Sequence, residues 1–168
     1  FKAKDTVNVT DKDGKVTELK AKNFIVATGA SAMVPPVWKV DGEKVVTYWE
    51  AILQDKLPKS VVVIGSGAIG VEFSTIWSAY GVDVTIVEML PRILPIEDEE
   101  VSKELERQLK KRGMKVMTST QLTKAAPHDG GVKVTLQQGE KVSELDVEVL
   151  LVAVGLAPVS RDAGHAVG

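Results

Sequence analysis

Residues 61–88 read VVVIGSGAIGVEFSTIWSAYGVDVTIVE, and this stretch decides the fold class. Val61–Ile64 is an apolar run that predicts a buried strand, and the glycine-rich turn GSGAIG follows it at Gly65–Gly70. Apolar residues then recur at the spacing of one helix face, at Ile69, Phe73, Ile76, Trp77 and Tyr80. Asp83–Glu88 predicts a second strand. Strand, glycine turn, helix and strand in this order predict a Rossmann-like α/β domain with a parallel sheet.

The three glycines of the turn have separate physical tasks in such a domain. Gly65 permits the tight turn out of the strand, and Gly67, which lacks a Cβ, lets a pyrophosphate approach the backbone. Gly70 lets the helix pack closely on the strand. The first amides of the helix and its dipole favour a phosphate group at the same place. The turn therefore predicts a dinucleotide site, and the alternative is a tight β–α turn with no ligand.

Glu88 closes the second strand, 18 residues after Gly70. A carboxylate there is expected to accept hydrogen bonds from an adenine-ribose diol and to repel a 2′-phosphate, which predicts NAD rather than NADP. Arg92 could weaken that preference, but it follows Pro91 and is expected outside the pocket. Glu72, on the first turn of the expected helix, either faces a nicotinamide or stabilises the helix N-terminus.

The residues before this stretch predict a hairpin and a linker. Residues 6–10 and 15–20 alternate around DKDG and predict a β-hairpin. Phe24–Ala27 predicts a short buried strand, and residues 30–46, with Pro35 and Pro36, predict a linker.

The residues after it predict one helix, two buried strands and a meander. Asp98–Arg112 predicts a helix with an apolar stripe at Val101, Leu105 and Leu109. Lys115–Thr118 and Leu150–Val154 predict buried strands. A three-stranded β-meander is expected over 120–126, 131–137 and 142–149.

Composition excludes several classes of function. The net charge of −2 over 168 residues shows no basic excess and argues against nucleic-acid or membrane binding. The chain has no Cys, so it has no disulfide, thiolate metal site or cysteine nucleophile. Ser66 lacks the G-x-S-x-G pattern of a nucleophile elbow, because Ile64 stands where the first glycine would be. His128 and His165 occur singly, as solvated loop residues do. We therefore expect neither a catalytic residue nor a metal ligand.

Longer strings identify a family. They are FIVATGA from Phe24, TYWEAI from Thr47, IGSGAIGVEF from Ile64, VEMLPRILPIEDEEVSKEL from Val87 and LLVAVGLAP from Leu150. In this order the chain resembles the flavin-dependent pyridine nucleotide–disulfide oxidoreductases, and within them it is most similar to the dihydrolipoamide dehydrogenases. The departures are ASAMVPP after the ATG segment and LAPV after Gly155, where the family often has Arg-Pro and Arg-x-Pro-Asn.

The resemblance implies a slice of a larger, homodimeric enzyme. Residues 1–46 would end an FAD-domain segment and its linker, 47–150 would be the NAD(H)-binding domain, and 151–168 would return into the FAD domain. β-rich stubs of the FAD domain would therefore flank the Rossmann-like domain. FAD, the redox disulfide and an interface domain would lie elsewhere in the enzyme, because this chain has one GxGxxG and no Cys. Hydride would pass between that FAD and NAD, in the cytoplasm or in a eukaryotic organelle matrix.

The resemblance also implies roles for individual residues. The pyrophosphate would be held by Gly65, Ser66, Gly67, Ala68, Ile69 and Gly70. Glu88 would bind the adenosine ribose with Met89 beside it, Glu72 would contact the nicotinamide end, and Gly155 would lie near the nicotinamide ribose. Ala68 replaces the gating Tyr of some relatives, so no aromatic lid is expected.

Other functions stay open at this point. The enzyme alternatives are a mercuric reductase and a soluble transhydrogenase, which share this domain and can take NAD(P)H. A non-catalytic dinucleotide sensor and a methyltransferase are alternatives from other classes. In a slice, the outer faces of residues 24–27 and 150–154 are expected to be uncovered and to promote self-association.

Overall fold

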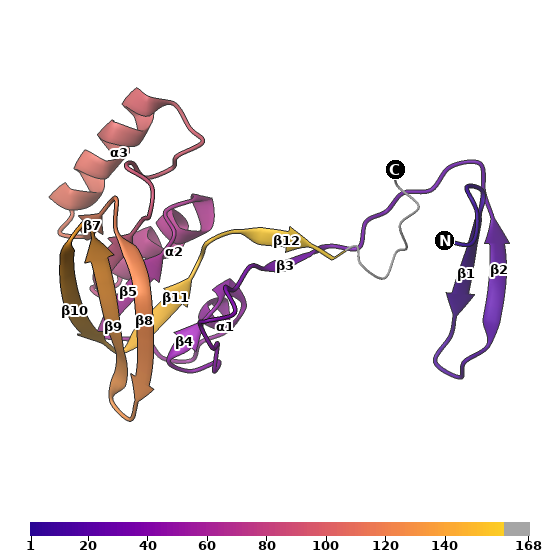
Figure 1. The fold of residues 1–168 in the computed structure, drawn as a ribbon, viewed down its shortest axis with the longest axis horizontal. Helices are drawn as coiled ribbons and strands as arrows, with labels where there is room; N and C mark the ends of the chain where they lie inside the picture. Colours follow the sequence, from indigo (N-terminus) through magenta and orange to yellow (C-terminus); the bar gives the residue numbers. More distant parts are fainter. Residues whose placement is uncertain (160–168) are drawn as a thin grey trace. The chain divides into compact units, whose positions relative to one another are not determined.

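A computed structural model describes residues 1–159 of the chain (Figure 1). It divides the chain into two compact units: Phe1–Ser31 with the described residues from Leu156 on, and Ala32–Gly155, here named the sheet unit. The sheet unit is longer at both ends than the expected 47–150. His165 and the second half of the expected final segment 151–168 lie outside the described residues.

A parallel five-stranded sheet forms the centre of the sheet unit. Its strands, in spatial order, are β4 (Val45–Val46), β11 (Val149–Val152), β5 (Ser60–Ile64), β6 (Asp83–Val87) and β7 (Lys115–Met117). Val61, Val62 and Val63 are fully buried, as the apolar run predicts for a strand that is covered on both faces. The predicted parallel sheet is confirmed.

Helices cover one face of this sheet. They are α1 (Tyr48–Ile52), α2 (Ala68–Ala79) and α3 (Glu99–Lys111). Side chains of α2 and α3 pack with one set of alternating strand residues, including Val61, Val63 and Leu151. The predicted helices α2 and α3 are therefore present, and Asp98 caps α3 by accepting from the amides of Glu100 and Val101.

The buried faces of both helices differ from the predicted stripes. In α2 the buried residues are Gly70, Ser74 and Trp77, while Ile76 and Tyr80 are 51% and 71% exposed. Trp77 packs in the helix-side core, and Ile69 and Phe73 pack against it, so only the Ile76 and Tyr80 part of the predicted stripe faces outward. In α3, Ser102 and Leu109 are buried and Val101 is exposed.

A β-meander covers the other face of the sheet. It consists of β8 (Gln121–His128), β9 (Gly131–Gln138) and β10 (Lys141–Val147), paired antiparallel in the order β10-β9-β8. The intervening set of strand residues packs against it, including Val62, Ile64 and Leu150. The predicted meander is confirmed, and the sheet unit has three layers: helices, parallel sheet and meander.

Most of residues 30–46, which were expected to be a linker, belong to the sheet unit instead, since that unit begins at Ala32. β4 is an edge strand of the parallel sheet, and Val34, Trp38 and Val40 pack against the meander-side core. A two-residue strand has too short a pattern to stand out in the sequence.

The first unit confirms one prediction and corrects another. β1 (Thr6–Thr10) and β2 (Val16–Lys20) form the predicted antiparallel hairpin, and β3 (Ala30–Ala32) pairs with β12 (Leu156–Pro158). The strand expected at 24–27 is wrong, because these residues form no strand. Their expected exposure is present, since Ile25 is 94% exposed. An apolar run becomes a buried strand only where other strands and side chains enclose it.

The expected exposure of residues 150–154 is also wrong. Leu150 and Leu151 are fully buried because β11 lies between β4 and β5 in the sheet.

Within the described residues, no helix has the length and apolar character needed to cross a lipid bilayer.

Candidate functional site

The glycine-rich turn connects β5 to α2 at the carboxyl edge of the parallel sheet. β5 is followed by β6 on one side and flanked by β11 on the other, so the chain changes direction across the sheet at β5. In open α/β sheets, ligands bind at the carboxyl ends of strands at such a switch point. Gly65, Glu88 and Gly155 all follow one of these three strands.

Backbone contacts require glycine at Gly65 and Gly70. Gly65 has a φ of +97°, and a Cβ there would overlap the carbonyl oxygen of Ala153. A Cβ on Gly70 would overlap the carbonyl oxygen of Gly65. Because these two residues lack a Cβ, the end of β5 can lie in close contact with the end of β11 and with the first turn of α2.

Gly67 differs from both. Its φ is −69°, and no heavy atom lies within 4 Å of a Cβ built there. Gly67 is also the N-cap of α2, and no side chain caps the helix. The first amides of a helix have no acceptor within the helix. The open space beside Gly67, next to the positive end of the α2 dipole, suits an anionic group.

Glu88 is bound to this turn by hydrogen bonds. Its Oε2 accepts from the amide of Ser66 at 2.9 Å and from the Ser66 hydroxyl at 2.7 Å. Its Oε1 accepts from the amide of Leu90 at 2.9 Å. Glu88 is 8% exposed and Ser66 is fully buried. The carboxylate predicted to contact a ribose is therefore an integral part of the turn.

The loop after β6 is held to the same turn. The amide of Leu94, which has a φ of +43°, donates to the carbonyl oxygen of Ser66 at 3.0 Å. The Ser102 hydroxyl of α3 donates to the carbonyl oxygen of Leu94 at 3.1 Å. Nothing in the local sequence indicates this role for Leu94, because a non-glycine residue seldom adopts a positive φ.

Arg92 is engaged within that loop. Its guanidinium donates to the carbonyl oxygen of Pro95 at 2.9 Å and lies 3.7 Å from the carboxylate of Glu99. These contacts engage the Arg92 guanidinium within its own loop, and its place outside the dinucleotide pocket stays a prediction.

Met89 and Gly155 flank the turn from the neighbouring strand ends. Met89 is 64% exposed directly after Glu88. Gly155 has a φ of +130°, accepts from the amide of Met33 at 2.9 Å, and would meet no heavy atom within 4 Å of a Cβ. The amide of Ala153 donates to the carbonyl oxygen of Ile64 at 2.8 Å and joins β11 to the end of β5.

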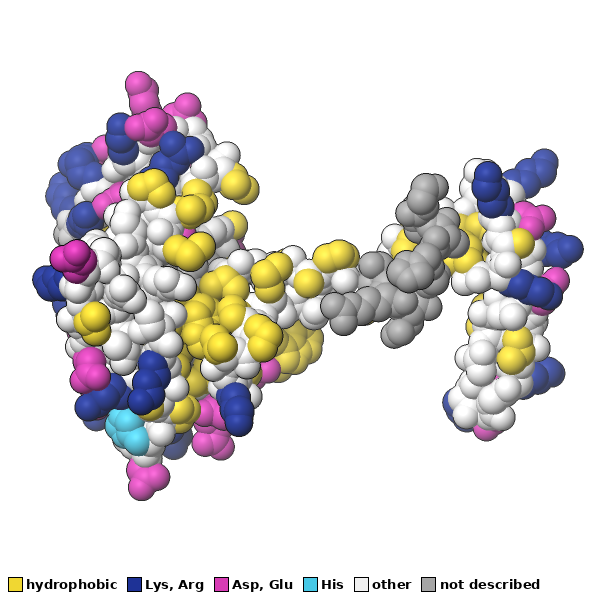
Figure 2. All heavy atoms as spheres, viewed as in Figure 1, with side chains coloured by type: hydrophobic (Ala, Val, Ile, Leu, Met, Phe, Trp, Pro, Cys, Tyr) yellow, Lys and Arg dark blue, Asp and Glu magenta, His cyan; other side chains and the backbone are white. Residues whose placement is uncertain are grey.

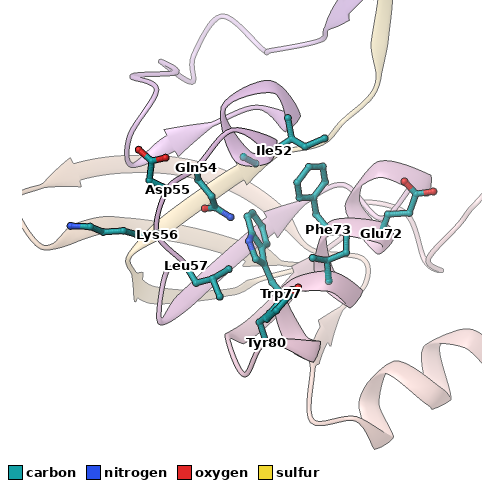
Figure 3. Close-up of a pocket in the computed structure, with 11 residues that line it drawn as sticks. Ile52, Gln54, Asp55, Lys56, Leu57, Glu72, Phe73, Trp77 and Tyr80 are labelled. Atoms are coloured by element: carbon teal, nitrogen blue, oxygen red, sulfur yellow. The ribbon is translucent and has the colours of Figure 1, made fainter.

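The sequence predicted that Glu72 lies on the first turn of α2, and this prediction is wrong. The helix begins at Ala68, so Glu72 is its fifth residue and is too far along to cap it. The side chain is exposed and lines a cavity of about 480 Å³ between α1, residues 54–57 and α2. Figure 3 shows its carboxylate at one end of this cavity, pointing away from Trp77 and Tyr80.

That cavity is separate from the glycine-rich turn. Its walls come from Ile52, Leu57, Phe73, Ile76, Trp77 and Tyr80, with Gln54, Asp55 and Lys56 at its rim (Figure 3). Of the ten predicted cofactor-binding residues, only Glu72 lines it.

Sequence reasoning missed the helix that forms one wall of the cavity. Thr47 and Glu50 form a capping box on α1: Glu50 Oε2 accepts from the Thr47 amide at 2.8 Å and from its hydroxyl at 2.6 Å. The pattern T-x-x-E is a known signal for a helix start and was available in the sequence.

His128 takes part in a local contact. Its Nε2 lies 2.9 Å from Asp146 Oδ1, and its Nδ1 accepts from the amide of Gly130 at 3.2 Å. In the part of the chain that the structure describes, no group of three or more His, Cys, Asp or Glu residues could hold a metal ion.

The sequence matches the family described as pyridine nucleotide-disulphide oxidoreductase over residues 1–168. It is 44% identical over 158 residues to a dihydrolipoyl dehydrogenase of Mycobacterium tuberculosis, a match that covers 94% of this chain and 34% of that protein. A dihydrolipoyl dehydrogenase of Rhizobium etli is 42% identical over 137 residues, covering 81% of this chain and 28% of that protein. The chain thus spans about a third of the length of the curated relatives it matches.

A solved structure gives the same result for the fold. LpdA from Mycobacterium tuberculosis superimposes with a TM-score of 0.82 at 31% identity, covering 96% of this chain and 35% of that one.

Proposed function

This chain belongs to the pyridine nucleotide-disulphide oxidoreductase family, and from that premise we propose that its sheet unit binds NAD(H) at the glycine-rich turn. The observation that carries the proposal is the pairing of an open, uncapped helix N-terminus at Gly67 with the buried Glu88 carboxylate on the next strand. In a dinucleotide fold these two features correspond to the pyrophosphate and ribose positions.

The shape of the turn fits a pyrophosphate. Gly65 and Gly70 keep the backbone compact, while the space beside Gly67 is open. Ala68, Ile69 and Gly70 are the first residues of α2, and their amides have no acceptor within the helix. We assign phosphate binding to these backbone amides.

The charge of the site favours NAD over NADP. Glu88 places a negative charge where a 2′-phosphate would lie, and Arg92 is occupied by Pro95 and Glu99. A phosphate at this position would meet a like charge without a free guanidinium. Met89 lies beside Glu88, and Gly155 and Glu72 are proposed to face the nicotinamide half.

The activity of the whole protein is proposed from the relatives. When bound, NAD supplies a nicotinamide ring that accepts or gives a hydride. The family name points to a disulfide as its redox partner, and the resemblance described above implies FAD as the second one. The chain contains no Cys and a single GxGxxG turn. We therefore place FAD binding, the disulfide and a homodimer interface in other parts of the intact protein, and assign this chain binding and orientation of the dinucleotide.

Titration of the purified chain with NADH and NADPH, followed by fluorescence, tests the assignment. NADH is expected to bind more tightly, and Glu88→Ala is expected to narrow the difference. Arg92→Ala, in the loop that follows Glu88, serves as a matched control. It is expected to leave the ratio of the NADH affinity to the NADPH affinity unchanged. Equal affinity in the wild-type chain, or a stoichiometric yellow flavin in the purified chain, would contradict the proposal.

A further inference from the structure

Ser66 has no hydrogen-bond donor left for a ligand. Its amide and its hydroxyl both donate to Glu88 Oε2, and its carbonyl oxygen accepts from the amide of Leu94. The residue is fully buried. A hydroxyl that is buried and already donating to a carboxylate cannot also donate to a phosphate, since it carries one proton.

The same contacts fix which oxygen of Glu88 can serve a ligand. A carboxylate oxygen offers about two acceptor positions. Both positions on Oε2 are taken by Ser66, at 2.9 and 2.7 Å, whereas Oε1 has one protein donor, the amide of Leu90 at 2.9 Å. Oε1 therefore retains the capacity to accept from a ribose hydroxyl.

We propose that Ser66 is a positioning residue for cofactor selection: its hydroxyl holds the Glu88 carboxylate so that Oε1 is presented to the adenosine ribose. This inference rests on the proposed NAD(H) function, and it replaces the pyrophosphate contact implied for Ser66 by the family resemblance. Ser66 acts through Glu88, so its effect is confined to ligands whose adenosine ribose has an unsubstituted 2′,3′-diol, which NADH has and NADPH lacks.

The first step of the test removes the hydroxyl and keeps the amide. In Ser66→Ala the affinity for NADH is expected to fall roughly three- to tenfold, the size of one lost hydrogen bond whose alignment matters. Affinities for NADPH and for reduced nicotinamide mononucleotide, which lacks the adenosine ribose, are expected to stay unchanged. An equal loss for all three ligands would overturn the inference, because it would place the action of Ser66 at the phosphates or at the turn as a whole.

Ser74→Ala is the matched control. Ser74 is also fully buried. Its hydroxyl donates to the carbonyl oxygen of Gly70 at 2.6 Å, within α2, and makes no hydrogen bond to Glu88. The Ser74→Ala substitution also removes one buried serine hydroxyl. The ratio of the NADH affinity to the NADPH affinity is expected to stay at the wild-type value. A fall in that ratio as large as the one in Ser66→Ala would count against the inference.

A double-mutant cycle separates this inference from the proposed function. If Ser66 acts through Glu88, the Ser66→Ala effect on NADH disappears in the Glu88→Ala background. An additive effect overturns the positioning role and leaves the ribose contact standing. Unchanged NADH affinity in Glu88→Ala alone would overturn the ribose contact, and with it this inference.

Circular dichroism shows whether Ser66→Ala folds. If it does not fold, a second variant is used for the same test. Ser66→Cys keeps the shape of the side chain and replaces the hydroxyl by a weak donor. It is expected to lose NADH affinity in the same direction. Full wild-type selectivity in a folded Ser66→Cys protein would also overturn the inference.

Discussion

Gly70 packs directly against Gly65, so that a Cβ on Gly70 would overlap the Gly65 carbonyl oxygen and lie 3.4 Å from a methyl group of Val63. Gly67, between them in the sequence, would direct a Cβ into open space. The fold therefore requires glycine at Gly65 and Gly70, whereas the open space beside Gly67 is where we propose that the pyrophosphate binds.

Alanine at these positions should separate stability from binding. Gly70→Ala is expected to lower the free energy of unfolding by about 1–3 kcal/mol or more, because backbone must move to admit the methyl group. Gly67→Ala is expected to cost below about 1 kcal/mol. It should nevertheless weaken NADH binding about tenfold or more, since the methyl group would enter the phosphate space. Urea unfolding and NADH titration of both variants measure this, and a Gly67→Ala protein with wild-type affinity would contradict the site.

Glu88 should matter for stability as well as for cofactor choice. Glu88→Ala leaves the amides of Ser66 and Leu90 and the Ser66 hydroxyl without their acceptor, in a buried place. The expected loss is about 1–3 kcal/mol in the free energy of unfolding without cofactor. Glu97→Ala removes an exposed carboxylate from the same loop and should change stability by about 0.5 kcal/mol or less. Equal stability losses in the two variants would show that the Glu88 contacts are not formed in solution.

The capping box on α1 predicts an acid-sensitive contribution to stability. The Thr47 hydroxyl and amide donate to the Glu50 carboxylate and lower its pKa below the ordinary value of 4.5. A pKa that is lower in the folded chain than in the unfolded chain stabilises the fold at pH values above 4.5 and loses that effect as the pH falls through the folded value. The stability difference between wild type and Glu50→Ala should therefore be largest near pH 7 and shrink below pH 4.5.

Urea unfolding at pH 7 and at about pH 3.5 checks this expectation. Thr47→Ala, which removes the N-cap, is expected to cost about 1 kcal/mol at pH 7. A wild-type to Glu50→Ala difference that grows on acidification would contradict the capping role.

The exposed apolar surface near α1 predicts self-association of the isolated chain. Figure 2 shows hydrophobic side chains gathered over α1 and β4. Ile52 and Leu53 are 68% and 66% exposed, and Ile76 of α2 lines the same cavity as Ile52. Contiguous apolar surface tends to be buried in contacts between molecules. Sedimentation velocity should therefore show oligomers that increase with concentration.

Charged substitutions locate the surface responsible. Ile52→Lys with Ile76→Lys should shift the chain toward monomer, whereas Val142→Lys on exposed β10 should not. A chain that is monomeric at every concentration would show that this apolar surface is too small to drive association.

Local sequence patterns were enough to determine the framework of the sheet unit. The apolar run of β5, the glycine turn, the period of α2 and the acid at the end of β6 lie within 28 residues, 61–88, and each is a short-range signal. The meander and α3 were predicted for the same reason, since turn residues and helix-end charges act on their own neighbourhood.

Other features depended on which segments meet in space. Phe24–Ala27 and Leu150–Val154 have similar apolar runs, but only the second lies between two strands and is buried. Ile76 and Tyr80 belong to the predicted apolar stripe with Trp77, yet only Trp77 is buried, because the packing of α2 on the sheet decides which face is covered.

The same distinction applies to the site. Sequence identified Gly65, Gly67, Gly70 and Glu88 as candidates, because the motif and its spacing lie along one chain segment. Only the tertiary structure joins Ser66 to Glu88, 22 residues away, and brings Ala153 against Gly65. A hydrogen bond or a steric contact depends on distances of a few ångströms between segments, and residue order alone does not specify those distances.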